Sequence, residues 1–186
     1  MLDKWKIFLA FSFILTLVIS GMGISPQVAN AYPTLSDGWY RIQPMHDLRR
    51  SIDALGPQVS YQGGRGNNLH MWDTLDVPQQ KFYLKKNKDG SFSLRSGYGN
   101  GYVTVHNKGN GANLYVMPWS ERNIDASRSF YLLSAGNSSY HIMSKLGLNL
   151  NFDCEGAQKR NGANVQLWTK ENNSLHHRWR FVRVRN

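Results

Sequence analysis

Three side chains near the C-terminal end carry the groups that a binding site for a sugar needs. Such a site needs an acceptor for vicinal hydroxyls, an amide that both donates and accepts hydrogen bonds, and a flat aromatic ring for the C–H face. Asp153, Gln166 and Trp168 supply these groups, 13 residues (166 − 153) separating the carboxylate from the amide. Asn161 and Gly162 lie between them and predict a turn. We therefore expect the three side chains to lie together.

The end of this segment is a phrase that occurs three times in the chain. It reads NGANVQLW at 161–168, NGANLYVM at 110–117 and GNNLHMW at 66–72. Aromatic residues recur with it: Phe82, Phe130 and Trp179 lie 48 (130 − 82) and 49 (179 − 130) residues apart. Near-constant spacing of this size indicates repeated supersecondary units. We expect three repeats, at about 37–85, 86–134 and 135–184.

Each repeat opens with alternating apolar residues. The openings read DGWYRIQP from residue 37, DGSFSLRS from 89 and GNSSYHIMS from 136. Alternation with a period of two predicts half-buried strands. We expect an all-β fold with about four strands in each repeat and about twelve in total. A closed threefold arrangement is favoured, because an open stack of three repeats would need distinct capping ends.

The residues YHIMSKLGLNLNFDCEGAQKRNGANVQLW, followed by HHRW, resemble a repeat of the ricin-type β-trefoil lectin family. The resemblance extends over 37–184 and is strongest in the third repeat. It implies a β-trefoil that binds carbohydrate without catalysis, with galactose-type glycans as the common ligands. It also implies that Asp153 accepts sugar hydroxyls, Gln166 braces or contacts them, and Trp168 forms the apolar platform.

The end of the third repeat departs from the family pattern, which favours asparagine and glutamine there. His176 and His177 stand there and are candidates for the rim of the site, together with Glu155. An imidazole can bond a hydroxyl, and binding that depends on it should weaken on protonation near pH 6.

The first repeat offers a second, weaker site with Asp53, Trp72 and Gln79, followed by Gln80. His70 replaces the glutamine of the family pattern, and the interval from Asp53 to His70 is 17 residues (70 − 53). This longer loop predicts that Asp53 is displaced from Trp72.

The second repeat has lost these groups. Val105 or His106 stands where an acidic residue is expected, Tyr115 replaces the glutamine and Met117 replaces the aromatic ring. We expect this copy to be structural.

The N-terminal segment has the layout of a cleaved secretory signal at 1–31. Lys4 and Lys6 precede an apolar run at 7–20, and VANA at 28–31 offers an A-x-A site. An uncleaved membrane anchor is the alternative. Cleavage would leave a β-trefoil domain at 32–186 with no membrane span. We therefore expect a secreted, extracellular protein.

Few residues suit catalysis or metal binding. Cys154 is the only cysteine, which excludes an intramolecular disulfide and a cysteine-rich zinc site, and we expect it to be buried. His176 and His177 are adjacent, and on a strand they would point to opposite faces and make a poor metal pair. We expect neither enzymatic activity nor a metal or cofactor.

The chain is basic, with a formal net charge of +10. Basic residues gather near its end: Lys159, Arg160, Lys170, Arg178, Arg180, Arg183 and Arg185. They suit an acidic polysaccharide as ligand, or an ordinary solvated edge strand whose charges deter pairing with other chains. Nucleic acid is disfavoured because export is expected. A further alternative is docking to a protein partner, as a toxin delivery subunit or an enzyme inhibitor.

Overall fold

The computed structural model describes residues 35–185, except 62–63, 106 and 119–123. The expected signal at 1–31 lies outside the described residues. In the part of the chain that is described, no helix has the length and hydropathy needed to cross a bilayer.

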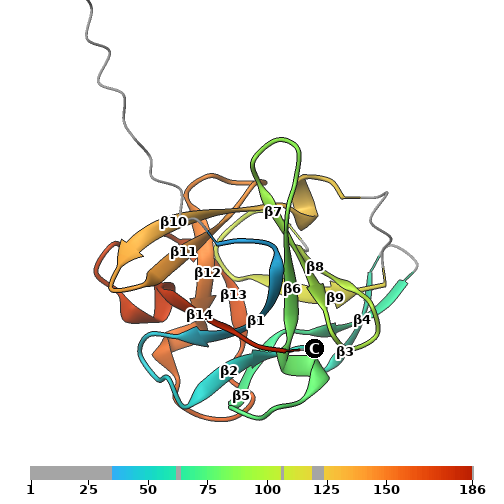
Figure 1. Cartoon of the computed structure of the whole chain (residues 1–186), viewed down its shortest axis with the longest axis horizontal. Helices are drawn as coiled ribbons and strands as arrows, with labels where there is room; N and C mark the ends of the chain where they lie inside the picture. The colour runs from blue at the N-terminus through green and yellow to red at the C-terminus, as the bar shows by residue number, and fades with distance from the viewer. Residues whose placement is uncertain (1–34, 62–63, 106, 119–123, 186) are drawn as a thin grey trace, which may run out of the picture. The chain divides into compact units, whose positions relative to one another are not determined.

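Six antiparallel strands close into a barrel (Figure 1). Around the ring each strand pairs with the next, and β10 pairs with β11 to close it. The six strands are β1 (Gly38–Pro44), β6 (Phe82–Lys86), β7 (Phe92–Ser96), β10 (Phe130–Gly136), β11 (Ser139–Ser144) and β14 (Trp179–Arg183). Each repeat therefore contributes its first and last strand to the barrel.

Each repeat also has a pair of antiparallel strands beside the barrel. These pairs are β2 (Arg50–Asp53) with β5 (His70–Asp73), β8 (Tyr102–Val105) with β9 (Ala112–Met117), and β12 (Leu150–Cys154) with β13 (Val165–Thr169). A barrel of six strands with three hairpins, one from each repeat, is a β-trefoil, as the sequence predicts.

The described residues contain fourteen strands rather than twelve. The two additional strands, β3 (Gln58–Tyr61) and β4 (Gly64–Asn68), form a hairpin inside the first repeat. β4 also pairs with β9 of the second repeat. The Gly-rich segment that appears in the sequence as a long loop thus contains two paired strands.

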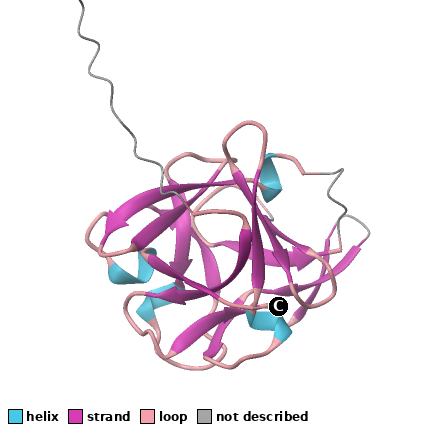
Figure 2. Cartoon of the chain, viewed as in Figure 1, coloured by secondary structure: helices cyan, strands magenta, loops and turns pink. Residues whose placement is uncertain are grey.

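Short 3-10 helices occupy several connections between the strands (Figure 2). They are η1 (Pro78–Gln80), η3 (Ala126–Arg128), η4 (Glu155–Ala157) and η5 (Leu175–His177). η1, η3 and η5 each lead into the last strand of their repeat.

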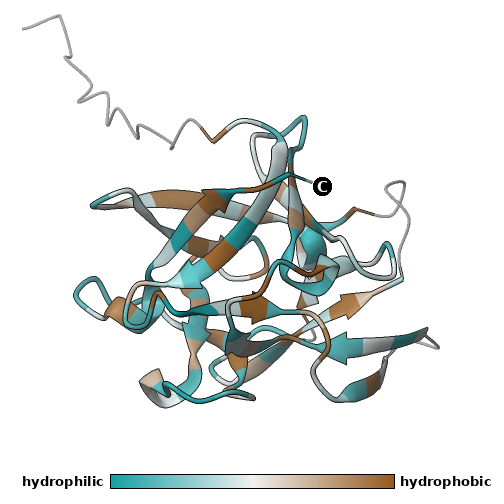
Figure 3. Ribbon diagram, turned by 60° about the horizontal axis from the view of Figure 1, so that its bottom comes forward, coloured by the Kyte–Doolittle hydropathy of each residue, from teal (hydrophilic) through white to brown (hydrophobic). Residues whose placement is uncertain are grey.

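The core is built from equivalent residues of the three repeats. The closing aromatics Phe82, Phe130 and Trp179 begin β6, β10 and β14 and are fully buried. Hydrophobic and hydrophilic residues alternate along the strands in Figure 3, as expected for strands with one face inward. Cys154 is a free, buried thiol, and its burial raises its pKa to about 12.

The repeated phrase joins the three repeats to one another. Asn68 donates from Nδ2 to Asn164 Oδ1 at 2.7 Å, and Asn164 donates from Nδ2 to Asn113 Oδ1 at 2.9 Å. Beside them, the backbone N–H of Leu69 donates to the carbonyl of Leu114 at 2.8 Å. The second copy of the phrase therefore supplies hydrogen bonds that join the three repeats.

The expectation that the basic last strand is an edge strand is wrong. β14 pairs with β1 on one side and with β11 on the other, so that Arg180 lies opposite both Gln43 and Ser139. Closure of the barrel gives this strand two neighbours. Arg183 packs against the Tyr40 ring, 5.5 Å from its centroid, and thus supports the fold.

Candidate functional site

The third repeat brings Asp153, Gln166 and Trp168 to one pocket. Asp153 on β12 lies opposite Gln166 on β13, and Gln166 Nε2 donates to Asp153 Oδ2 at 3.0 Å. Trp168 follows two residues later and lines the same pocket, which has a volume of about 520 Å³. The Trp168 side chain is 38% exposed, so it is a surface platform and not a core residue.

Both histidines of η5 face the same carboxylate. His176 Nδ1 lies 2.7 Å from Asp153 Oδ1, and His177 Nε2 lies 3.3 Å from the same oxygen. The sequence-based expectation that they point to opposite faces of a strand is wrong, because they lie on a 3-10 turn. His176 is partly exposed at the rim, whereas His177 is fully buried.

The hydrogen bonds of His177 fix its tautomer. The backbone N–H of Glu171 donates to His177 Nδ1 at 3.1 Å, so this nitrogen carries the lone pair. In the neutral imidazole the proton is then on Nε2, which lies 3.3 Å from Asp153 Oδ1.

Asp153, His176 and His177 offer ligand atoms within 4.8 Å of one another, as a metal site would require. The proton on His177 Nε2 occupies the position where a metal would need a lone pair. The cluster is therefore better suited to holding a carboxylate in place than to binding a metal.

Asp153 is held in its charged form. Its burial raises its pKa, but the hydrogen bonds from His177, Gln166 and His176 outweigh burial and leave the pKa below the ordinary value. The charged carboxylate is an acceptor, which suits vicinal hydroxyls.

The first repeat builds an equivalent site. Asp53 on β2 lies opposite His70 on β5, as Asp153 lies opposite Gln166, and His70 Nε2 is 3.5 Å from Asp53 Oδ1. Trp72, also 38% exposed, stacks on the His70 ring with centroids 5.3 Å apart. These side chains and Gln79 line a pocket of about 230 Å³.

The prediction that Asp53 is displaced from Trp72 is wrong. The β3–β4 hairpin takes up the additional residues between β2 and β5, and the register of the two strands is preserved. Gln80, fully buried, donates from Nε2 to Asp53 Oδ2 at 3.1 Å. Gln79 lines the pocket as the sequence predicts, and Gln80 holds the carboxylate from behind.

The second repeat lacks these groups. Thr104 lies opposite Tyr115, so a threonine and not Val105 takes the place of the carboxylate. His106 lies outside the described residues. Met117, in the place of the tryptophan, is fully buried and offers no exposed platform.

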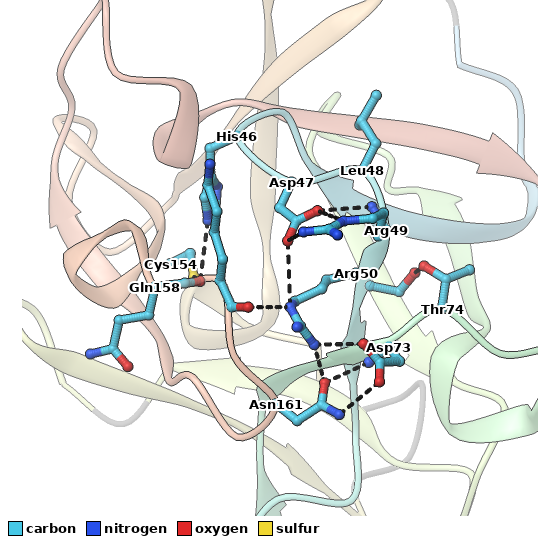
Figure 4. A network of polar contacts seen from close by, with 12 residues as sticks. His46, Asp47, Leu48, Arg49, Arg50, Asp73, Thr74, Cys154, Gln158 and Asn161 are labelled. Carbon is cyan, nitrogen blue, oxygen red and sulfur yellow. Dashed lines mark hydrogen bonds and ion pairs between the residues drawn. The ribbon is translucent and has the colours of Figure 1, made fainter.

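Each site is supported by a neighbouring repeat. Asn110 of the second repeat accepts a hydrogen bond from the backbone N–H of Thr169, next to Trp168, at 2.7 Å. Asn161 of the third repeat accepts one from the backbone N–H of Asp73, next to Trp72, at 2.9 Å. Figure 4 shows Asn161 in a network with Asp73 and Arg50. The asparagine of the repeated phrase thus fixes a strand of another repeat's site.

Sequence reasoning named most of the residues in these pockets but missed Leu55, Leu75 and Glu171 on their rims. No motif marks these positions. What they share is the number of residues that separates each of them from the aspartate or tryptophan of its own site. This regularity becomes evident only when the two sites are compared.

Residues 78–168 match the family model of ricin-type beta-trefoil lectin domain-like proteins. The chain has a β-trefoil fold, and this part of it is similar to ricin-type lectin domains. Among curated proteins, none matches the sequence.

Solved structures share this β-trefoil fold at low sequence identity. The designed threefold-symmetric protein ThreeFoil is 21% identical with a TM-score of 0.69, over 80% of this chain and all of that one. A ricin B-like lectin of Macrolepiota procera, solved with lactose, is 18% identical with a TM-score of 0.62, over 82% of this chain and all of that one. A mosquitocidal holotoxin is 13% identical with a TM-score of 0.67, over 81% of this chain but only 17% of the toxin.

Proposed function

We propose that this protein is a secreted, non-catalytic lectin that binds glycans at two shallow sites, one in the first repeat and one in the third. One observation supports this most strongly. A buried, hydrogen-bonded aspartate and an exposed tryptophan recur at the same strand register in two repeats. Packing alone does not require a tryptophan at the surface, whereas a sugar's C–H face does.

Each pocket holds the chemistry for one sugar residue. The aspartate accepts a pair of hydroxyls, His70 or Gln166 beside it supplies a further polar group, and the tryptophan covers the apolar face. The lactose in the Macrolepiota procera lectin supports a galactose-type ligand. Single shallow sites bind weakly, and a millimolar Kd corresponds to about −4 kcal/mol. Two sites on one rigid domain gain avidity on a surface coated with glycans.

Non-catalytic binding is supported by how the aspartates are held. Asp53 and Asp153 both accept hydrogen bonds from neighbouring glutamine side chains, which favours a fixed acceptor over a group that exchanges protons. Incubation with oligosaccharides should release no new reducing ends. Sustained release that is lost on Asp153→Asn would instead identify a glycosidase.

A docking role in a larger toxin is the second candidate, favoured by the likeness to part of the holotoxin. Free sugar separates the two roles. Binding of the full-length chain to glycoprotein-coated surfaces should be inhibited by millimolar lactose and unaffected by the same concentration of sucrose. Binding to a partner that no sugar displaces, and that persists after enzymatic removal of the glycans, would favour protein docking.

A further inference from the structure

The two pockets differ at a pair of equivalent rim positions. Leu55 follows Asp53 by two residues (55 − 53), and Glu155 follows Asp153 by two (155 − 153). Each of these residues lines the pocket of its own repeat.

The second rim position is matched by hydrogen bonding as well as by sequence. Leu75 follows Trp72 by three residues (75 − 72), and Glu171 follows Trp168 by three (171 − 168). The backbone N–H of Leu75 donates to Gln80 Oε1 at 2.8 Å. The backbone N–H of Glu171 donates to His177 Nδ1 at 3.1 Å. Each rim residue is therefore fixed by the same buried side chain that holds the aspartate.

The rim of the first site is apolar. Leu55 is 40% exposed and Leu75 is 46% exposed, and both stand beside Trp72 around one small pocket. Leucine side chains left in water at a pocket mouth offer apolar area to a ligand that extends beyond one sugar ring.

The rim of the third site is acidic. Glu155 and Glu171 are exposed and join Asp153, and no lysine or arginine is among the described residues that line this pocket. The chain as a whole carries +10, so the carboxylates make this pocket a local exception. Such a rim attracts a cation and repels an anionic sugar.

Because two leucines at the first site are replaced by two glutamates at the third, we infer that these two rim residues determine which class of ligand each site binds. The first site takes glycosides with an apolar aglycone, and the third site takes sugars that carry a protonated amine. The inference rests on the proposed function, because it specifies what the same two sites prefer.

Titration calorimetry with single-site variants of the full-length chain tests this. Trp72→Ala removes the first site, so that binding reports on the third. Trp168→Ala removes the third site, so that binding reports on the first. The probes at pH 7 are methyl β-galactoside, hexyl β-galactoside, galactosamine and N-acetylgalactosamine. We expect the first site to bind the hexyl glycoside about fivefold more tightly than the methyl glycoside. We expect the third site to prefer galactosamine to N-acetylgalactosamine about fivefold, with the preference lost in 0.5 M salt.

Rim substitutions test the assignment to residues. Leu55→Glu with Leu75→Glu should abolish the preference for the hexyl glycoside, and Glu155→Gln with Glu171→Gln should abolish the preference for the amine. Leu148→Glu is the matched control, since Leu148 is 71% exposed and lies outside both pockets. Equal binding of all four probes at both sites would overturn the inference while leaving the lectin function intact. If none of the four probes binds the unsubstituted chain, both this inference and the proposed lectin function are overturned.

Discussion

His177 in the third repeat has the structural role that Gln80 has in the first. Each is fully buried, each approaches the aspartate of its site, and each accepts the backbone N–H of a rim residue. An imidazole in one tautomer thus accepts the same backbone bond as the amide and places its second nitrogen 3.3 Å from the carboxylate. The role is positional, since His177 is fully buried at the base of the pocket, behind Asp153 and the more exposed His176.

This equivalence predicts that His177→Gln retains sugar binding at the third site within about twofold. An amide can restore both bonds, as Gln80 does. His177→Ala should weaken binding and destabilise the fold by about 2–4 kcal/mol, because it leaves Asp153 short of a donor, the N–H of Glu171 without an acceptor, and a cavity. Thermal unfolding and sugar titration of both variants measure these effects. Equal loss of binding in the two variants would show that the imidazole itself is required.

Substitution of the surface tryptophan should separate binding from folding. Trp168→Ala should remove binding at the third site and change the free energy of unfolding by less than about 1 kcal/mol, since the ring is already 38% exposed. The control Trp179→Ala should cost about 3–5 kcal/mol, because that ring is fully buried and its Nε1 donates to the Phe152 carbonyl at 2.9 Å. Chemical denaturation measures both. If Trp168→Ala unfolds, the ring belongs to the core and the assignment of the third site is wrong.

The supporting asparagines predict effects that cross between repeats. Asn110→Ala should weaken the third site and leave the first unchanged, although Asn110 belongs to the second repeat. Asn161→Ala should weaken the first site more than the third, because it releases Asp73 beside Trp72. Titration of each variant in the Trp72→Ala and Trp168→Ala backgrounds assigns the loss to a site. An equal loss at both sites would point to general destabilisation.

His141 predicts an acid sensitivity of the fold. Burial away from water lowers its pKa to about 4 and outweighs the hydrogen bond to the His177 carbonyl, which acts to raise the pKa. The unfolded chain binds a proton there from about pH 6.5 downward, which the folded chain does not until about pH 4. Stability should therefore fall as the pH falls through this window.

The variant His141→Gln should lose this part of the dependence. Between pH 7 and 4.5 the unsubstituted chain should lose roughly 2–3 kcal/mol more than the variant, measured by urea denaturation at each pH. Parallel losses in the two proteins would show that His141 does not titrate as its burial implies.

The sequence was sufficient for the fold and for the pairing of Asp153 with Gln166 in the third repeat. The spacing of Phe82, Phe130 and Trp179 defined the repeats, and these residues are buried at equivalent strand starts. The spacing of Asp153 and Gln166 defined a pair that the structure places in register. Both inferences depended on regular periods, which extended structure preserves.

The errors arose where local geometry is not periodic. The interval from Asp53 to His70 overestimated their separation, because loop length does not determine strand register and a hairpin can hold the additional residues. The faces of His176 and His177 were assigned as on a strand, whereas three residues of 3-10 helix turn both toward Asp153. The rim residues Leu75 and Glu171 lie on connections between strands, where each backbone N–H is held by a buried side chain from later in the chain.

The central claim is that two tryptophan-based sites account for glycan binding. A glycan array probed with the full-length chain, Trp72→Ala, Trp168→Ala and the double variant tests it most directly. We expect discrete glycan signals that each single variant reduces and that the double variant loses while its thermal unfolding stays cooperative. Signals confined to sulfated or acidic glycans, unchanged in the double variant and abolished by salt, would contradict the claim and assign binding to the basic residues instead.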